Sequence, residues 1–271
     1  MHAGSMRLWR YPYGRGQARR VARCAWCYVL LVVVTMMLVA GRSMAETTRI
    51  AVASNFTDAI GAIVERFETG TGHKVTLSFG STGKHYAQIR NGAPFDAFFA
   101  ADRRRPELLE EEGVALPGTR FTYAVGRLVL WSPRTEVVDP EGRVLERGEF
   151  RHLAVANPKL APYGRAAEEV LRARGLWDRL SGQLVRGENI GQTFQFVKSG
   201  NAELGFVAYS QLKRPNHPIE GSFWRVPQAL YTPIEQQAVL LKDSEAARSF
   251  LSFVRSAESV TLIREYGYET P

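Results

Sequence analysis

Four places in the sequence combine small, hydroxyl-bearing and amide residues where an apolar segment gives way to a helix-like one. They are ASNFTDA with Ser54 and Asn55, FGSTGK with Ser81 and Thr82, NPKLAPYGRAA with Tyr163, and RGENIGQTF with Asn189 and Ile190. The first turn of a helix leaves backbone N–H groups without partners, and these groups can receive an anion. A single junction of this kind is more often an ordinary N-cap. Four that converge would offset about two negative charges, because each helix N-terminus carries roughly half a positive charge.

The Gly83-Lys84 pair in FGSTGK suggests a phosphate-binding P-loop, but the flanking residues exclude one. A P-loop has a glycine five residues before its second glycine and a serine or threonine directly after the lysine. Here Ser78 and His85 occupy those places. We therefore expect no nucleotide site, and we expect Lys84, early in its helix, to point to solvent.

Catalytic arrangements have little support in this sequence. No G-x-S-x-G motif is present. Asp96 and Asp102 flank a predicted strand and could act as paired carboxylates, but capping or ion-pair roles are the simpler expectation. Four histidines lack metal-ligand spacing, and we expect surface or capping positions for them: His73, His85, His152 and His217. Three tyrosines are expected to pack in the interior: Tyr123, Tyr209 and Tyr231.

The first 45 residues have the three-part pattern of a secretory signal peptide. A basic segment precedes the apolar run Ala25–Ala40, and Ser43-Met44-Ala45 supplies the small residues of a cleavage site. We expect cleavage at about Ala45/Glu46 and a periplasmic mature protein. The alternative is a permanent anchor, but a run of about 16 residues is short against the roughly 20 that span a bilayer. The Arg19-Arg20 pair raises the twin-arginine route, and the general secretory route is preferred.

Removing this leader changes what the charge and the cysteines imply. The chain carries +8 and the leader contains seven arginines and no acidic residue, which leaves about +1 for the remaining 226 residues. The basic excess is therefore mostly an export signal, and we expect no nucleic-acid partner. Cys24 and Cys27 both lie in the leader, so the mature chain has neither disulfide nor thiolate chemistry.

The remaining sequence alternates extended and helical patterns. Apolar runs predict strands over 49–53, 75–79, 96–101, 127–131, 152–157, 203–209 and 235–241. Helical spacing and stop signals predict helices over 59–67, 84–89, 106–112, 162–174 and 192–198, with two more at the end of the chain, the first capped by Asp243 or Ser244. This alternation predicts an α/β protein with mostly parallel sheets, in which ligands bind at the carboxyl ends of strands.

From Arg49 to Tyr268 the chain resembles the periplasmic molybdate-binding proteins of ABC importers. The stretches that carry the resemblance are AVASNFTDAI, FGSTGKHYAQIRNGAPFDAFFAAD, AVANPKLAPYGRAAEEVL, GNAELGFVAYSQL and the terminal IREYGY. The resemblance implies a type II periplasmic-binding-protein fold, with two α/β lobes joined by a two-strand hinge and a ligand cleft between them. It places the hinge crossings near YAVGRLVLW and YTPIEQQAV, which makes residues 46–125 and 232–271 one lobe and 126–231 the other.

The resemblance also implies a set of ligand-binding residues. Members of this family hold a tetrahedral dianion through neutral donors, and position by position that role falls on Ser54, Asn55, Ser81, Tyr163 and the backbone N–H of Ile190. One branch has a tyrosine where this chain has Ala208. Another branch has its tyrosine in the APYG turn and an asparagine in the first loop, and this chain is similar to that branch. Whether Thr82 or Tyr209 also contacts ligand stays open.

These observations together predict an exported solute-binding protein that captures molybdate, with tungstate as a second ligand, and delivers it to an inner-membrane ABC permease. We expect a monomer that is not an enzyme and has no cofactor, with molybdenum bound only as its oxyanion. A sulfate- or phosphate-type binder is the nearest alternative. The others are an exported enzyme using Asp96, Asp102 or Glu188, and a ferric-ion carrier, for which the paired tyrosines are missing.

Overall fold

The computed structural model describes residues 45–271 of the protein. Apart from Ala45, the predicted signal peptide lies outside the described residues, and so does any test of its cleavage. None of the helices within 45–271 has the length and apolar character needed to cross a membrane.

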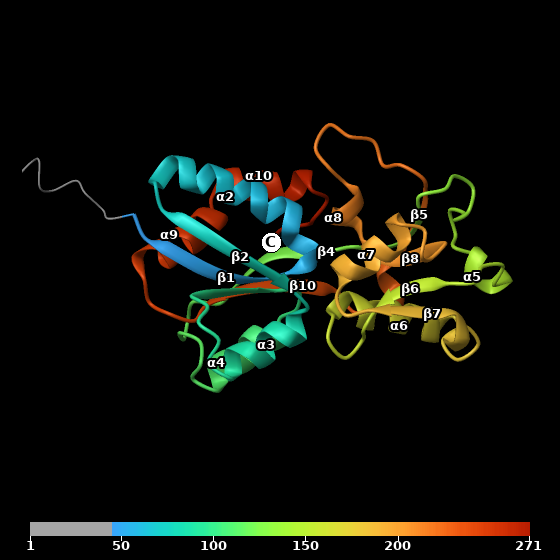
Figure 1. Cartoon of the computed structure of the whole chain (residues 1–271), viewed down its shortest axis with the longest axis horizontal. Coiled ribbons are helices and arrows are strands. Elements are labelled where there is room, and N and C mark those ends of the chain that lie inside the picture. Colours follow the sequence, from blue (N-terminus) through green and yellow to red (C-terminus); the bar gives the residue numbers. More distant parts are fainter. Residues whose placement is uncertain (1–44) are drawn as a thin grey trace, which may run out of the picture. The chain divides into compact units, whose positions relative to one another are not determined.

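Two five-stranded sheets form the framework of this part of the chain (Figure 1). In the first sheet the strand order is β2 (Lys74–Gly80), β1 (Thr47–Ala53), β3 (Ala97–Ala100), β10 (Ile234–Leu240) and β4 (Phe121–Gly126). In the second it is β7 (Leu184–Gly187), β6 (Leu153–Ala156), β8 (Leu204–Ala208), β5 (Leu128–Ser132) and β9 (Ser222–Arg225). We call each sheet with its helices a lobe, the first lobe being the one that contains β1.

Both sheets have the same pattern of strand directions. In the first, β1 is parallel to β2 and β3, whereas β10 is antiparallel to β3 and β4. In the second, β6 is parallel to β7 and β8, whereas β5 is antiparallel to β8 and β9. Four strands of each sheet therefore run the same way, as predicted. The reversed strand is in each case the first one after the chain crosses from the other lobe.

Helices cover both faces of the first sheet. Ile50 and Val52 point to one face, where they pack in one cluster with α2 (Thr57–Thr71), α9 (Glu245–Val254) and α10 (Ala257–Glu265). The intervening Ala51 points to the other face, in a cluster with α3 (Thr82–Arg90) and α4 (Arg104–Glu111). This alternation is the period of two that a strand imposes on its side chains, and Figure 1 shows the two helix layers.

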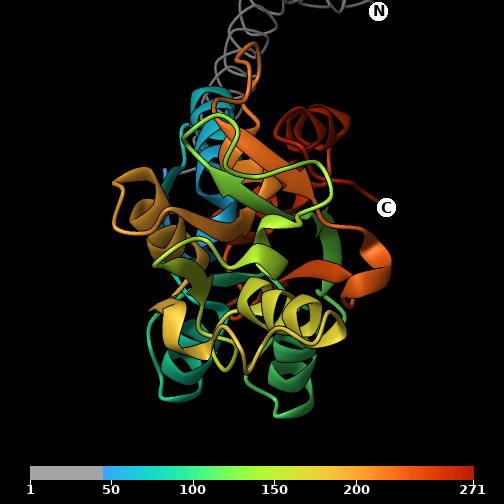
Figure 2. The ribbon, with the colours of Figure 1, turned by 90° about the vertical axis from the view of Figure 1, so that its right-hand side faces the viewer.

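The second sheet is covered in the same way. Helix α6 (Pro162–Ala173) packs on the face formed by Leu153 and Val155, and α7 (Ile190–Lys198) packs on the opposite face, beside Ala154. Figure 2 shows α6, in yellow, against one side of this sheet. The short elements are α5 (Val144–Arg147), α8 (Tyr209–Leu212) and the 3₁₀ turns η1 (Ser54–Phe56), η2 (Ser181–Gln183) and η3 (Gln228–Leu230).

Most predicted elements agree with the structure to within a few residues, with three differences. Strands β4, β7 and β9 were not predicted. Helix α2 continues through Gly70 and ends at Gly72, whose φ of 77° is in the left-handed region and whose N–H donates to the Glu68 carbonyl. Ser244 rather than Asp243 caps α9, since the Ser244 side chain accepts from the Ala247 N–H.

The chain changes sheets twice, between Gly126 and Leu128 and between Arg225 and Ile234. The predicted boundary at 231/232 lies in the second of these segments, and the one at 125/126 lies inside β4, one residue before the first. We keep residues 46–125 with 232–271, and 126–231, as the proposed extents of the two lobes.

Candidate functional site: an uncharged cavity between the lobes

All four junctions singled out in the sequence line one small cavity. From the first lobe its walls are Ala53, Ser54, Asn55, Gly80, Ser81, Thr82 and Ala101; from the second they are Ala161, Pro162, Tyr163, Asn189 and Ile190. The starts of η1 with α2, α3, α6 and α7 therefore converge. Each sits at the carboxyl end of a strand, where ligands bind in open α/β sheets.

The cavity is narrow. About 10 Å³ of it is open to the centre of a water-sized sphere, which is close to the room that one water molecule needs. A tetrahedral oxyanion is larger than water, so its binding requires the lining side chains to move outward.

Ser54 joins the two lobes across the cavity. Its Oγ donates to Asn189 Oδ1 at 3.0 Å and accepts from the Gly191 N–H at 3.1 Å. Asn189 is the N-cap of α7 and also accepts from the Gln192 N–H at 2.9 Å. The Ser54 hydroxyl is thus both an inter-lobe contact and part of the cavity wall.

Ser81 and Thr82 are both buried, and the hydroxyl oxygen of each accepts from a backbone N–H. Ser81 is the N-cap of α3, and its Oγ accepts from the Lys84 N–H at 3.3 Å, so its own hydrogen stays available for a ligand. Thr82 Oγ1 accepts from the Ala101 N–H at 3.0 Å and thereby fixes the end of β3 to the start of α3.

Tyr163 lies at the second position of α6, after Pro162, and is 1 % exposed. Its hydroxyl oxygen accepts from Gln236 Nε2 at 3.2 Å. Burial raises the pKa of the Tyr163 phenol well above its ordinary value of 10. The phenol therefore keeps its hydrogen at neutral pH and can donate it.

Asn55 lines the cavity, but both hydrogens of its side-chain amide are already in hydrogen bonds. Its Nδ2 donates to Gln236 Oε1 at 2.7 Å and to the Tyr268 hydroxyl at 3.0 Å, and its buried Oδ1 has no partner among the described residues. The group that Asn55 can offer an anion is its backbone N–H, which lies in the first turn of η1, where N–H groups lack intrahelical partners.

Ile190 is the first residue of α7 and is 3 % exposed. An amide at this position has no partner within its own helix. The neighbouring Gly191 and Gln192 amides are already bound by Ser54 and Asn189. The Ile190 N–H is thus the amide of this turn that remains for a ligand.

No charged residue is among those that line the cavity. The nearest cation in sequence, Lys84, is 52 % exposed and pairs with Glu188 at 3.1 Å across the lobes. Its predicted orientation to solvent is confirmed. Positive potential in the cavity therefore comes from backbone amides and helix N-termini.

The carboxylates considered for catalysis lie outside the cavity and have structural partners. Asp96 is buried and accepts from the Arg49 N–H at 2.6 Å. Asp102 caps the start of α4 through the Arg105 N–H at 3.0 Å and pairs with the Arg105 side chain. Within residues 45–271 no group of three His, Cys, Asp or Glu side chains could hold a metal ion.

Two of the histidines, for which the sequence predicted surface or capping positions, are buried. His73 is 5 % exposed, and its Nδ1 accepts from the Glu46 N–H at 3.2 Å. His85 is 3 % exposed, with its ring directly behind the Gly80 backbone. A Cβ at Gly80 would lie 2.8 Å from His85 Nε2, so the ring fills the space that a side chain in this loop would need.

The sequence left open whether Thr82 or Tyr209 contacts ligand, and the two residues lie in different places. Thr82 lines the cavity, whereas Tyr209 does not. The Tyr209 hydroxyl accepts from Arg225 at 2.6 Å, and the guanidinium lies over its ring. Tyr123 and Tyr231 are buried, as expected.

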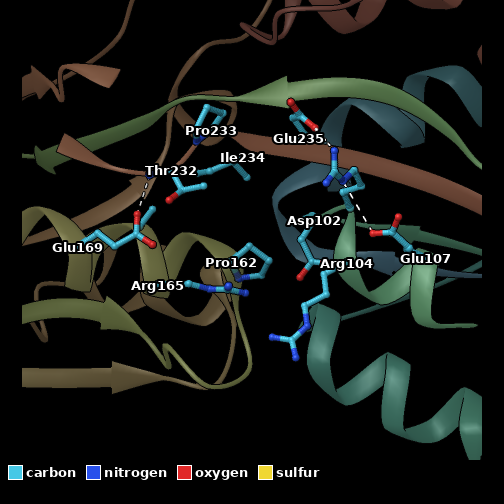
Figure 3. Close-up of a pocket in the computed structure, with 13 residues that line it drawn as sticks. Asp102, Arg104, Glu107, Pro162, Arg165, Glu169, Thr232, Pro233, Ile234 and Glu235 are labelled. Atoms are coloured by element: carbon cyan, nitrogen blue, oxygen red, sulfur yellow. Dashed lines mark hydrogen bonds and ion pairs between the residues drawn. The ribbon is translucent and has the colours of Figure 1, made fainter. Parts of the chain in front are cut away.

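A larger pocket of about 470 Å³ borders the cavity at Ala101 and Pro162 (Figure 3). Its walls carry both signs of charge, and Arg103 lies 3.9 Å from Glu107 and 4.0 Å from Glu235. Glu169, on the opposite wall, accepts from the Thr232 N–H at 2.6 Å. The walls together carry four carboxylates, among them Asp102, against three arginines, which suits a dianion poorly. The small uncharged cavity is the better candidate.

Two mixed sheets covered by helices and joined by two crossings, with a small cavity between the lobes, define a two-lobed solute-binding protein of the type II periplasmic fold. The chain belongs to the bacterial extracellular solute-binding proteins, whose family pattern matches residues 48–269. A molybdate-binding protein of Azotobacter vinelandii is 48 % identical over 242 residues, which cover 88 % of this chain and 96 % of that protein. One of Rhodobacter capsulatus is also 48 % identical, over 81 % of this chain and 87 % of that protein. The solved periplasmic molybdate-binding protein of Azotobacter vinelandii superposes with a TM-score of 0.81 at 42 % identity, covering 83 % of this chain and 99 % of that one.

Two residues behind the cavity were missed by the sequence prediction. Gln236 is fully buried and contacts both Asn55 and Tyr163. Tyr268 is 4 % exposed and donates to the Asn55 carbonyl at 2.7 Å. The signal for Gln236 was present, since EQQAVLL places two amides inside an otherwise apolar strand, where each needs a partner.

The burial of His85 predicts how stability depends on pH. Burial lowers the pKa of His85 below its ordinary 6.5, so the unfolded chain takes up a proton more readily than the folded one. The contribution of neutral His85 to the free energy of unfolding should be fully present above about pH 6.5, and the free energy of unfolding should fall as the pH decreases from there. Urea unfolding at steps from pH 7.5 to 5.5 should show this decline, and His85→Gln should flatten it.

This pH window separates the histidine from the carboxylates. Those with lowered pKa values, such as Glu203, start from ordinary values of 4.5 or less and lose their contribution at lower pH. A parent curve that is flat from pH 7.5 to 5.5, or an unchanged slope in His85→Gln, would contradict the assignment.

Proposed function

We propose that this protein captures molybdate, with tungstate as a second ligand, in the cavity between its lobes. The observation that carries the proposal is that four helix starts converge on a buried cavity without a charged side chain. The ligand-binding residues are then the hydroxyls of Ser81 and Tyr163, the backbone amides of Asn55 and Ile190, and Ser54, whose hydroxyl hydrogen turns from Asn189 to the anion on binding. The 48 % identity to two molybdate-binding proteins supports the same ligand.

The chemistry of the donors favours a fully deprotonated anion. Molybdate and tungstate carry no proton near neutral pH, so each of their oxygens can accept a hydrogen bond. Phosphate keeps a proton at that pH, and no carboxylate lines the cavity to accept it. Leaving a buried donor unpaired costs about 1–3 kcal/mol. Sulfate has no proton either, so its exclusion has to come from the size of the cavity.

Binding is proposed to hold the lobes together. Apart from Ser54, the Gly83 N–H donates to the Leu160 carbonyl at 2.8 Å, and Arg214 pairs with Asp58 at 3.2 Å, each across the lobes. An anion that bridges helix starts of both lobes adds to these contacts and shifts the population toward closure. A closed, loaded form is what an ABC permease would recognise.

The cellular setting follows from the same proposal. The protein acts in the periplasm after removal of its leader, as a monomer that carries its ligand to an inner-membrane permease. It performs no chemical reaction and requires no cofactor. The carboxylates that an enzyme would need are occupied in hydrogen bonds to backbone amides and in ion pairs.

The proposal is tested by calorimetric titration of the chain from Glu46 onward with molybdate, tungstate, sulfate and phosphate. Molybdate and tungstate should bind, and ligand at about a hundred times its Kd should add about 2.7 kcal/mol of stability in a parallel thermal melt. Binding of sulfate or phosphate in their place would be consistent with the fold and would contradict the proposed ligand. Binding of none of the four would overturn the function.

The Ser81 hydroxyl provides a second prediction. Ser81→Ala should weaken molybdate binding about 10- to 100-fold, because a hydrogen bond to a charged group is worth about 1.5–3 kcal/mol. The matched control is Ser244→Ala, since Ser244 caps α9 in the same way, at 3.2 Å from the Ala247 N–H, and does not line the cavity. Both variants should lose similar stability as N-caps. Equal affinities in the two variants would remove Ser81 from the site.

A further inference from the structure

We infer that Gln236 is a positioning residue of the anion site, which sets the direction in which the Tyr163 hydroxyl donates. The inference rests on the proposed function and adds a residue that does not itself line the cavity. Gln236 lies on β10, the strand that follows the second crossing between the lobes, and is fully buried.

The two ends of the Gln236 amide bind opposite partners. Its Nε2 donates to the hydroxyl oxygen of Tyr163, a residue of the second lobe, at 3.2 Å. Its Oε1 accepts from Nδ2 of Asn55, a residue of the first lobe, at 2.7 Å. One side chain of the hinge strand thus holds a cavity residue from each lobe.

Further hydrogen bonds fix the orientation of this amide. The Tyr123 hydroxyl lies 3.0 Å from Gln236 Oε1 and 3.1 Å from the Ala100 carbonyl oxygen, and its one hydrogen serves both acceptors. The donor committed to the oxygen end is therefore Asn55 Nδ2. Asn55 is held in turn by Tyr268, whose hydroxyl accepts from Asn55 Nδ2 and donates to the Asn55 carbonyl. Burial raises the pKa of both tyrosines above their ordinary values, so the network consists of neutral groups.

This orientation decides what Tyr163 can offer a ligand. A phenol has one hydrogen, and because Gln236 presents its N–H, the Tyr163 oxygen accepts and its hydrogen stays free for the cavity. A reversed amide would present its oxygen and take that hydrogen. The Tyr163 oxygen would then direct a lone pair toward the oxyanion, and the two would repel each other.

The glycine at the end of β4 provides an independent observation. A Cβ at Gly126 would lie 2.1 Å from the Tyr163 hydroxyl and 2.6 Å from Gln236 Nε2. Real Cβ atoms do not approach so closely, so the contact between these two side chains requires that position 126 have none. The backbone of the first crossing thus leaves the space that the Gln236 amide and the Tyr163 phenol occupy.

A double-mutant cycle tests whether Gln236 acts through Tyr163. Molybdate affinity is measured by calorimetry for Gln236→Met, Tyr163→Phe and the double variant, with thermal melts to confirm folding. Tyr163→Phe should weaken binding about 10- to 100-fold, as expected for loss of a hydrogen bond to an anion. Gln236→Met should weaken it about 10-fold, and the double variant should bind no more weakly than Tyr163→Phe, because coupled residues are not additive.

The matched control is the next residue on the same strand. Gln237 is 6 % exposed and also makes two side-chain bonds, to Thr122 Oγ1 at 3.0 Å and from Arg120 at 2.8 Å, away from the cavity. Gln237→Met should leave the affinity within about twofold. Losses from Gln236→Met and Tyr163→Phe that multiply in the double variant, or an equal loss in Gln237→Met, would overturn the inference.

A second variant covers the case in which Gln236→Met does not fold. Gly126→Ala should weaken binding by displacing Tyr163 and should cause no further loss in the Tyr163→Phe background, whereas Gly61→Ala, with open space around it, should have no effect. A loss that persists in the Tyr163→Phe background would overturn the inference. If the parent chain binds molybdate and the cycle is additive, only the role of Gln236 fails; if the parent chain binds no oxyanion, the proposed function fails with it.

Discussion

The site depends on one constraint, which is that helix starts from both lobes meet in a buried space without any charged side chain. A dianion in such a place has to be stabilised by partial charges, and backbone amides at helix N-termini provide them without the desolvation cost of a buried arginine or lysine. The amides among these donors are held in direction by the helices that carry them, whereas the lining side chains have to move outward to admit the anion. Each lobe contributes two of the helix starts that line the cavity. They are those of η1 with α2 and of α3 from the first lobe, and those of α6 and α7 from the second.

Much of the remaining structure keeps these helix starts in place. Thr82 fastens the start of α3 to the end of β3, and the His85 ring supports the Gly80 backbone from behind. A Cβ at Gly164 would lie 2.3 Å from the Ala156 carbonyl oxygen, so the close seating of α6 on β6 also requires glycine. Unsatisfied polar groups in such a core would destabilise it. Both ends of the buried Gln236 amide have hydrogen-bond partners, one in each lobe.

Local sequence patterns were sufficient to find each half of the site but not its assembly. Strand-to-helix junctions at Ser54, Ser81, Tyr163 and Ile190 followed from apolar runs that end in capping residues, and their convergence required the topology. The resemblance to molybdate-binding proteins supplied that topology. Patterns of this kind do not show where a polar side chain points, which is why Gln236 was missed and His85 was expected at a surface or capping position. Both are buried because a tertiary partner, and not the local sequence, decides their environment.

The most direct test of the account is a crystal structure of the chain from Glu46 onward with molybdate, with diffraction data recorded at the molybdenum absorption edge. We predict one anomalous peak inside the cavity, with ligand oxygens within hydrogen-bond distance of the Ser54, Ser81 and Tyr163 hydroxyls and the Asn55 and Ile190 amides. A peak in the mixed-charge pocket of Figure 3, or one in the cavity next to a side chain that carries a charge, would contradict the claim that uncharged donors at helix starts hold the anion.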